Sequence, residues 1–551
     1  MYRLAYLHNK YPDSRKLNVA ITYTNRASNE MEKRLYEMRI DTNNIWIGTI
    51  HQFCMQFIIR PYAMYSDRLR CGFRIIDEFQ KNEYGKQIAN KFKVSPNLWD
   101  LFGIPEIVEE YENLKKQNKE IDFDDILRQS CILLQKYEFI AENIARIIRS
   151  IHIDEYQDTN ELQYIALSCI VKKNPSINVL FVGDVNQAIY SNLGGVAKSP
   201  DEIRNLFQIP FCEDSLTGCY RSTQRLIDYY REFSTEPITT KSLADYSDES
   251  GLILYNNNIK KTSLAEQIKE VIISELSNGV REEEICVAAP QWYQLFPLAS
   301  ELKTLLPEIN FDAPDITAFK YEPLNPFYIL ASLIFSESGR HVRLRKKRAT
   351  EFITIVSEDY KHFIPDSFDA FSLLKIINKV VFQNDFIDGI DCFSKVWQMV
   401  CLRMLGTIST DDAINGTYNA FIRKVEDRIS RFNLFRDYYS LSKCFKEKSG
   451  IVITTIHGMK GEEYNTVIAC GLLNGFIPNW RYIRDLKMER ASATKRLLYV
   501  LCSRAKKNIY LYSEVGRYTR TRHLLTPTDE LYCYSYPYDS LDRVEESGGG
   551  C

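Results

Sequence analysis

Short apolar runs alternate with longer amphipathic stretches along most of this chain, which is the pattern of helices that cover a parallel β-sheet. A first group of strands is expected at Leu17–Tyr23, Asn44–Thr49, Ile147–Ile153 and Val179–Val182. A second group is expected at Leu252–Tyr255, Ile285–Ala289, Ile451–Thr455, Thr466–Cys470 and Asn508–Tyr512. The pattern therefore predicts an α/β fold with two parallel sheets.

Each predicted sheet is interrupted by a long stretch of helical character. Residues from about Cys54 to Ile121 are charged, and those from about Pro314 to Lys448 are aromatic and in places basic. We interpret both stretches as inserted helical domains. The expected division is 1–54 with 119–224 for the first α/β domain, 55–118 for its insertion, 225–313 with 449–520 for the second α/β domain, 314–448 for its insertion, and 521–551 for a C-terminal tail.

The chemistry of the chain is concentrated first in Ile151-His-Ile-Asp-Glu-Tyr-Gln-Asp158, where an apolar run ends in adjacent carboxylates. The carboxyl edge of a parallel sheet is where ligands bind in open α/β folds. One carboxylate can hold Mg²⁺ while its neighbour orients an attacking water. A solvated loop is the plain alternative for an Asp-Glu pair taken alone. The run makes ATP hydrolysis the leading hypothesis.

Three further clusters offer groups that a nucleotide needs. Gln187 follows the apolar run that ends at Val182, where its amide could sense a γ-phosphate. Tyr220 and Arg221 offer an aromatic face for a base and a cation for phosphate. Arg504 falls on a strongly apolar stretch, where an unpaired arginine would be costly. An anionic ligand or a structural carboxylate would each explain it.

Other polar clusters at strand ends suit a nucleic-acid strand. Thr22-Tyr-Thr-Asn25 combines hydroxyls, an amide and a ring that can stack on a base. Thr49-Ile-His51 and Thr454-Thr-Ile-His-Gly-Met-Lys460 repeat a strand end with a hydroxyl and an imidazole. Each histidine taken alone is equally compatible with a structural role. The two together favour a shared track across both sheets.

Composition excludes some classes of protein. The 551 residues carry a net charge of −2, so any DNA contact must come from a local basic groove. The 14 cysteines form no C-x-x-C pair, which argues against a zinc site or a disulfide framework. No signal pattern and no apolar stretch of about 18 residues occurs. The chain is predicted to be cytoplasmic, with no membrane partner.

Together these residues resemble the superfamily 1 helicases of the UvrD/Rep/PcrA type. The resemblance extends to about residue 515 and is carried by Thr22-Tyr-Thr-Asn-Arg-Ala, Gly48-Thr-Ile-His-Gln-Phe-Cys, Asp122-Phe-Asp-Asp-Ile-Leu, Ile153-Asp-Glu-Tyr-Gln-Asp-Thr, Gly183-Asp-Val-Asn-Gln-Ala-Ile-Tyr, Tyr220-Arg-Ser, Thr455-Ile-His-Gly-Met-Lys-Gly-Glu-Glu and Leu498-Tyr-Val-Leu-Cys-Ser-Arg-Ala. It implies two RecA-like domains with two inserted helical subdomains, ATP with Mg²⁺ as cofactors, and movement along one DNA strand, usually 3′→5′.

The resemblance also implies a role for each matching residue. Asp154 would hold Mg²⁺, Glu155 would activate water, Tyr220 would stack on adenine and Glu463 would contact the ribose side of the nucleotide. The residues expected at the γ-phosphate are Gln187, Arg221 and Arg504. The residues expected near DNA are Tyr23, Thr24, Asn25, Thr49, His51, Tyr190, Thr455, His457 and Lys460. The expected partners are single-stranded DNA and junctions of single- and double-stranded DNA.

The chain departs from the family pattern in two places. It contains no Gly-Lys-Thr or Gly-Lys-Ser, so the phosphate-cradling loop and its lysine are missing. We expect a truncated start rather than a naturally loop-less protein, and we expect hydrolysis to be impaired in the chain as given. Tyr190 is followed by Ser191-Asn-Leu-Gly-Gly195, where relatives often carry an aromatic residue and Arg-Gly, so DNA grip could be weaker.

Several functions stay open at this point. A DNA translocase or 3′→5′ helicase is the first, and a nucleic-acid-binding module without turnover is the second. A third is the helicase subunit of a Gabija-type anti-phage system, which would act with a separate nuclease subunit. The basic run Arg340–Arg348 could contact duplex DNA or a partner, although a solvated helix face is its commoner explanation.

Overall fold

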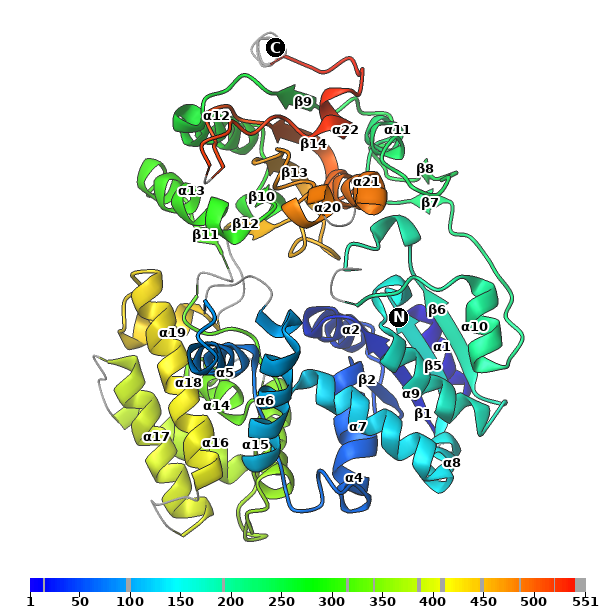
Figure 1. The fold of residues 1–551 in the computed structure, drawn as a ribbon, viewed down its shortest axis with the longest axis vertical. Coiled ribbons are helices and arrows are strands. Elements are labelled where there is room, and N and C mark those ends of the chain that lie inside the picture. The colour runs from blue at the N-terminus through cyan, green and yellow to red at the C-terminus, as the bar shows by residue number, and fades with distance from the viewer. Residues whose placement is uncertain are drawn as a thin grey trace.

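In the computed structural model, the fold is an assembly of two parallel β-sheet units and two groups of helices (Figure 1). The structure describes residues 1–12, 15–95, 101–190, 194–313, 317–339, 342–383, 388–406, 412–445, 450–484, 487–519 and 521–540. Within these ranges, no helix is long and apolar enough to cross a membrane. The expected boundaries at 313/314 and 448/449 fall beside undescribed residues, and residues 541–551 of the expected tail lie outside the described part.

The first sheet has four parallel strands in the order β2-β1-β5-β6. Its strands are β1 (Leu17–Thr22), β2 (Ile45–Thr49), β5 (Ile148–Asp154) and β6 (Asn178–Val182). Val19 of central β1 is paired with Trp46 on one side and Ile151 on the other. The helices of this unit are α1 (Tyr2–Lys10), α2 (Asn25–Glu37), α7 (Phe123–Lys136), α8 (Glu138–Ile147), α9 (Glu161–Lys172) and α10 (Pro200–Phe207). All four strands predicted for this sheet are confirmed.

The second sheet has six parallel strands in the order β11-β12-β10-β13-β14-β9. Its strands are β9 (Ile253–Asn256), β10 (Ile285–Ala289), β11 (Phe311–Asp312), β12 (Ile451–Thr455), β13 (Tyr464–Ala469) and β14 (Ala505–Tyr512). The helices of this unit are α11 (Gln224–Arg231), α12 (Leu264–Ser277), α13 (Trp292–Leu305), α20 (Trp480–Arg484), α21 (Arg490–Cys502) and α22 (Asp529–Tyr532). The five strands predicted here are confirmed, and two-residue β11 was not predicted.

The carboxyl ends of the strands are fixed by helix caps that the sequence encodes locally. Thr49, which ends β2, accepts from Gln52 N at the start of α3 (Ile50–Cys54), and the Gln52 side chain accepts from Thr49 N. Thr24, just after β1, caps α2 by accepting from Ala27 N. Such caps satisfy amide groups that a helix leaves unpaired at its start. Each predicted polar cluster is thus held at the edge of its sheet.

The first inserted region contains two short α-helices, a π-helical turn, two longer α-helices and a small sheet. Its elements are α3, the π-helical turn Met55–Ile59, α4 (Arg60–Tyr62), β3 (Arg74–Ile75), α5 (Glu78–Lys91), α6 (Pro105–Gln117) and β4 (Glu120–Ile121). Part of the expected 55–118 insertion, from Met55 to Phe73, belongs to the core of the first sheet. A separate small core begins at Ile76 and includes Tyr111.

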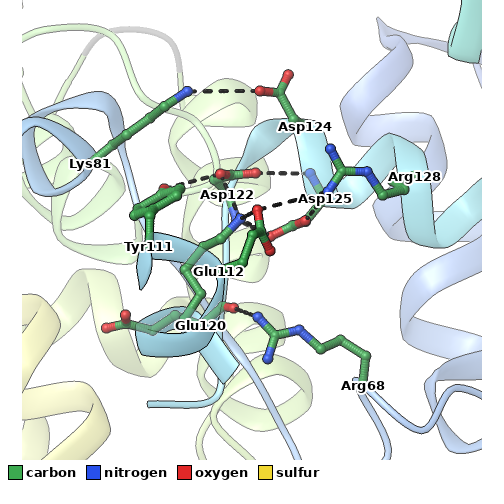
Figure 2. Close-up of polar contacts among 10 residues, drawn as sticks. Arg68, Lys81, Tyr111, Glu112, Glu120, Asp122, Asp124, Asp125 and Arg128 are labelled. Atoms are coloured by element: carbon green, nitrogen blue, oxygen red, sulfur yellow. Dashed lines mark hydrogen bonds and ion pairs between the residues drawn. The ribbon is translucent and has the colours of Figure 1, made fainter. Parts of the chain in front are cut away.

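A buried ionic network joins this region to α7 (Figure 2). Lys115 of α6 is 1% exposed, and its Nζ lies 2.9 Å from Glu112, 2.9 Å from Asp122 and 2.6 Å from Asp125. Tyr111 donates a further hydrogen bond of 3.0 Å to Asp122. Asp122 also caps α7 by accepting from Asp125 N. The network therefore fixes the end of the insertion to the start of α7.

The second inserted region is built of helices joined by loops, and it has no named strand among its described residues. Its helices are α14 (Pro326–Ile334), α15 (Val342–Thr354), α16 (Ala370–Gln383), α17 (Gly389–Met404), α18 (Asp412–Arg431) and α19 (Tyr438–Lys443), which share one apolar core. They lie beside α5 and α6 in Figure 1. Arg60 forms a two-pronged ion pair of 2.8 and 2.9 Å with Asp359, and Lys424 lies 2.8 Å from Asp77. Ion pairs therefore hold the two inserted regions together.

The basic run Arg340–Arg348 is not a uniform charged face. Its first two residues lie outside the described part of the chain. Arg345 is buried and donates to the carbonyl oxygens of Leu333 and Ser336. Lys347 forms an ion pair of 2.5 Å with Glu32 of α2. One of its cations is therefore buried in the fold, and another is paired at the surface.

The C-terminal segment packs onto the second sheet up to residue 540. Asp539 forms two hydrogen bonds with Ile253 of the edge strand β9. Its carboxylate accepts from Ile253 N at 2.8 Å, and its backbone N donates to Ile253 O at 2.9 Å. Arg225 forms an ion pair of 2.9 Å with the same carboxylate. Tyr538 shares a hydrogen bond of 3.2 Å with Tyr229. The expected tail 521–551 is thus a docked segment over its described length.

Candidate nucleotide and DNA site

The predicted carboxylates Asp154 and Glu155 lie at the carboxyl end of β5, at the centre of the edge that faces the second unit. Glu155 has a φ of 53°, a left-handed conformation that is uncommon for a residue with a side chain. Such strain costs about 1–3 kcal/mol and persists where the surroundings impose it. It turns the chain directly after Asp154, so the two carboxylates leave the strand in different directions.

The Glu155 side chain is held by a neighbouring residue of the first unit, Gln157. Gln157 donates a short hydrogen bond to the Glu155 carboxylate and accepts one of 3.2 Å from Asp184 N. A Cβ on Gly183 would lie 2.1 Å from Gln157 Oε1, so only glycine allows this close approach. Sequence reasoning did not assign a role to Gln157, although it lies in the quoted motif. The strand ends of β5 and β6 are therefore joined through one amide.

The environment of Asp154 suits a metal-binding carboxylate. Burial raises its pKa to about 6, and the charge of Glu155 acts in the same direction. A nearby cation would offset this cost, because it favours the charged form. Among the described residues, no three His, Cys, Asp or Glu side chains converge on a metal position. Mg²⁺ in nucleotide sites uses one or two carboxylates together with phosphate oxygens, so the donor set fits Mg²⁺-nucleotide.

Gln187 connects the two units directly. It ends the 3₁₀ turn Val185–Gln187, and its Nε2 donates to Asp184 at 2.9 Å. Its Oε1 accepts a hydrogen bond of 2.9 Å from Arg504, which lies between α21 and β14. Its backbone oxygen accepts from Lys460 at 2.6 Å. The structure therefore brings three of the predicted residues together across the boundary between the units.

Arg504 is a buried cation held by neutral groups. It is 2% exposed, and it donates to Gln187 Oε1, to Val500 O and to Ser503 Oγ. No carboxylate is among its hydrogen-bond partners in the described part of the chain. Burial, together with the charge of Arg221, lowers its pKa to about 10, and the charge of Glu155 opposes this shift. A buried guanidinium in these surroundings is a site for an anion.

Arg221 lies beside Arg504 on the second unit. It donates to Glu463 at 3.0 Å and to Ser503 O at 3.1 Å. Lys506 also lies 3.1 Å from Glu463. Partial burial raises the pKa of Glu463, but the hydrogen bonds from these two cations bring it below its usual range. Glu463 thus stays ionised and positions Arg221.

Tyr220 projects from the same segment with 77% of its surface exposed. Its ring is free to stack on a planar group, unlike the largely buried tyrosines of the neighbouring helices. The adjacent Ser222 donates to Ala505 O at 2.7 Å and is fully buried. This bond attaches the segment to β14. The predicted base-stacking and phosphate residues therefore belong to one rigid edge of the second unit.

The residues predicted near DNA from the first sheet lie at the ends of β1 and β2. Tyr23 stacks on Tyr190 with ring centroids 4.7 Å apart. Thr24 and Thr49 act as helix caps, as described above, and Asn25 Oδ1 is buried without a hydrogen-bond partner in the described chain. His51 packs edge-on against Phe123, and burial lowers its pKa to about 4, so the ring is neutral.

The residues predicted near DNA from the second sheet contact those of the first sheet across the boundary between the two units. Tyr190 donates to His457 O at 2.9 Å. Thr455 Oγ1 accepts from Gly458 N at 3.1 Å, which closes the turn that carries His457. Burial lowers the pKa of His457, and Lys460 acts in the same direction. The two sheets therefore present one continuous row of aromatic rings, hydroxyls and imidazoles.

Lys460 has a largely buried side chain rather than an exposed one. Its side chain is 6% exposed, and its Nζ lies 2.5 Å from Asp158 and 3.7 Å from Glu155. It also lies 5.3 Å from the centre of the Tyr190 ring. In this conformation Lys460 joins the carboxylate cluster to the aromatic row. Sequence reasoning gave Asp158 no role, because its partner lies 302 residues away.

Comparison with known proteins agrees with this geometry. Residues 1–102 and 102–208 match the model of the UvrD/REP helicase N-terminal domain, and residues 420–515 match that of the UvrD-like helicase C-terminal domain. The ATP-dependent DNA helicase PcrA of Bacillus subtilis is 22% identical over 632 residues, covering 99% of this chain and 82% of the relative. A probable DNA helicase II homolog of Mycoplasma pneumoniae is 22% identical over 585 residues, covering 93% and 79%. PcrA of Leuconostoc citreum is 23% identical over 629 residues, covering 96% and 81%.

Proposed function

Because the chain belongs to the UvrD-type superfamily 1 DNA helicases, which are ATP-dependent enzymes, we propose that it hydrolyses Mg²⁺-ATP between its two sheets to move 3′→5′ along single-stranded DNA. The substrates we propose are single strands and their junctions with duplex. Asp154 would hold Mg²⁺, Glu155 would orient the attacking water, and Tyr220 would stack on the adenine. Glu463 would lie at the ribose side.

The observation that carries this proposal is the pair formed by Arg504 and Gln187. A fully buried guanidinium from one unit points at an amide of the other, beside two carboxylates and without a carboxylate partner in the described chain. A fixed cation of this kind stabilises charge that develops on a transferred phosphoryl group. The cation and the carboxylates come from different units, so they act together only when the units are closed.

Each residue of the site has its own proposed role in ATP hydrolysis. Glu155, held by Gln157 and by its left-handed backbone, would accept a hydrogen bond from the attacking water. Bound Mg²⁺ would neutralise phosphate charge beside Asp154. Arg504 and Arg221 would meet the γ-phosphate from the second unit, and Gln187 would exchange its bond to Arg504 for one to the nucleotide.

The proposed DNA track runs over the ends of β1, β2 and β12. Its residues are Tyr23, Thr24, Asn25, Thr49, His51, Tyr190, Thr455, His457 and Lys460. Rings such as Tyr23 and Tyr190 would stack on bases, which is worth about 1–3 kcal/mol per base. The ammonium group of Lys460 contacts both Gln187 O and Asp158 and lies 5.3 Å from the centre of the Tyr190 ring. It is therefore placed to link nucleotide turnover to movement along the strand.

ATP hydrolysis by the purified chain, with and without single-stranded DNA, tests the proposal. Turnover should rise with DNA and fall about 10²–10⁴-fold in Glu155→Gln, because that change removes the group that orients water. Glu138→Gln is the matched control, since Glu138 is paired with Lys173 on an exposed surface away from this site. Because the chain as given lacks the phosphate-cradling loop, a chain extended at its N-terminus with a Gly-Lys-Thr loop is measured beside it. Absence of DNA-stimulated turnover in both chains would favour a binding module and would overturn the proposal.

Duplexes with a single 3′ or 5′ overhang test the proposed direction of movement. Unwinding of the 3′-tailed duplex alone is the expected result, and preference for the 5′ tail would contradict it. A separate nuclease subunit and a role in anti-phage defence stay predictions, since neither follows from the described contacts. Cleavage of DNA by a co-purifying subunit would be the observation that supports them.

A further inference from the structure

Asn186 is a buried side chain that spans the boundary between the two units. It lies in the turn Val185–Gln187 of the first unit and is 3% exposed. Its partners, Thr235 and Glu236, follow α11 of the second unit. Its own backbone N donates to Asp184 at 2.9 Å, which fixes the turn. The side chain is therefore anchored on one unit and bonded to the other.

Four hydrogen bonds converge on this one amide. Oδ1 accepts from Thr235 N at 2.7 Å, from Glu236 N at 2.8 Å and from Thr235 Oγ1 at 3.0 Å. Nδ2 donates to Glu236 O at 3.1 Å. Backbone N–H groups can only donate and a carbonyl can only accept, so the orientation of the amide is determined. Only an asparagine-sized amide satisfies all four partners.

Residues of the proposed nucleotide site lie near the Asn186 contact on both units. Gln187 follows Asn186 directly and accepts from Arg504 of the second unit. At the other end of α11, Ser222 and Thr223 bond to the backbone of β14, beside Arg221 and Arg504. Helix α11 thus connects the Asn186 contacts to the segment that carries both arginines. A shift at Thr235 would be transmitted to those arginines.

We propose that Asn186 is a positioning residue, which sets the distance between Gln187 and the arginines of the second unit and so controls the rate of ATP turnover. This inference rests on the proposed function. Asn186 itself makes no contact with the reacting groups. It acts by holding Thr235 and Glu236 in one register against the turn that ends in Gln187. Loss of the contact leaves the nucleotide-site side chains in the chain, but the distance from Gln187 to the arginines of the second unit is then no longer fixed.

Two substitutions separate this role from a general loss of stability. Asn186→Ala removes all four bonds. Asn186→Asp keeps the acceptor for Thr235 N and Glu236 N but places a carboxylate oxygen against Glu236 O. Asn174→Ala is the matched control, because Asn174 makes contacts of the same kind with Ala145 and Ser176 inside the first unit alone.

The measurements are DNA-stimulated ATP turnover and hydrogen exchange of the Thr235 and Glu236 amides in the full chain. We expect kcat to fall about 10-fold in Asn186→Ala with KM for ATP within about 3-fold, since a rate-limiting alignment rather than nucleotide binding is affected. Asn186→Asp should fall between Asn186→Ala and the unaltered chain, and Asn174→Ala should match the unaltered chain. Exchange at Thr235 and Glu236 should be fastest in Asn186→Ala.

The outcomes distinguish the two proposals. Faster exchange at Thr235 and Glu236 with an unchanged kcat would overturn the positioning role while leaving the helicase activity in place. Unchanged exchange in Asn186→Ala would overturn it as well, because the contact would then not hold these amides. No turnover in the unaltered chain and in the chain extended with a Gly-Lys-Thr loop is a failure of the proposed function, and unchanged exchange in Asn186→Ala would then still overturn the Asn186 contact. If Asn186→Ala does not fold, the graded effect of Asn186→Asp decides.

Discussion

Arg504 and Lys115 are both buried cations, and their surroundings are opposite. Lys115 lies among Glu112, Asp122 and Asp125, whereas Arg504 has only an amide, a hydroxyl and a carbonyl among its described hydrogen-bond partners. Burial alone would lower the pKa of Lys115, but its carboxylate partners raise it above the usual 10.5. For Arg504, burial prevails and lowers the pKa to about 10.

We infer that the difference separates a structural cation from one that serves a ligand. A buried charge with a complete set of partners contributes to the fold as long as all partners remain. A buried charge without them costs stability, and it is retained where a ligand supplies the missing charge. Lys115 fixes the first insertion to α7, and Arg504 faces the boundary between the two units. Substitutions at the two positions should therefore change different quantities.

The largest expected effect is on catalysis at Arg504. Arg504→Met keeps an extended side chain but removes the charge, so kcat for ATP should fall about 10³-fold. The free energy of unfolding should stay equal or rise, because a poorly compensated buried charge has been replaced by an apolar group. Steady-state kinetics and urea unfolding of the same preparation check both parts. A large loss of stability with unchanged kcat would show that Arg504 is structural.

Lys115→Met should give the converse result. Removing the shared cation leaves Asp122 and Asp125 buried without their partner, which is expected to cost about 3–5 kcal/mol of unfolding free energy. The kcat of the folded fraction at low temperature should change little, because Lys115 lies in α6, outside the nucleotide site. Urea unfolding and kinetics at 10 °C are the measurements. Catalysis that fails while stability is retained would break the comparison.

The sequence predicted the sheets and most of the site because both depend on local patterns. Apolar runs such as Ile285–Ala289 were long enough to define a strand, whereas the two-residue strands β3, β4, β7 (Gly218–Cys219), β8 (Lys241–Ser242) and β11 were too short to show a period. Asp154 and Glu155 lie next to each other in the chain, so their pairing could be seen in the sequence. That local signal is why this candidate edge could be predicted from the sequence.

Contacts between distant segments could not be predicted in the same way. The bond from Arg504 to Gln187 joins residues 317 positions apart, and Arg60 pairs with Asp359 across 299 positions. The basic run Arg340–Arg348 was easy to see in the sequence, but its charges do not form one exposed face, because Arg345 turns inward and donates to carbonyl groups. The sequence did not point to Asn186, because its partners Thr235 and Glu236 belong to a loop of the other unit and carry no recognisable motif.

The pH dependence of stability should also differ between the two cations. The pKa of Lys115 is raised in the folded state, so its contribution is complete below pH 10.5 and is lost as the pH rises through the folded pKa. The difference in unfolding free energy between the unaltered chain and Lys115→Met should thus be constant from pH 7 to about 9.5 and decline above about pH 10.5. Arg504, whose pKa is lowered to about 10, should show the opposite sign there. Urea unfolding across this range checks both.

The smallest effect is expected at the outer edge of the Lys115 network. Arg128 lies 3.2 Å from Asp125, but half of its side chain is exposed. Water and salt screen such a pair, so Arg128→Ala should cost less than about 1 kcal/mol, and added salt should reduce this cost further. Urea unfolding at low and high salt would measure it. A loss as large as that of Lys115→Met would mean that the number of charges in the network, rather than burial of the central one, determines its stability.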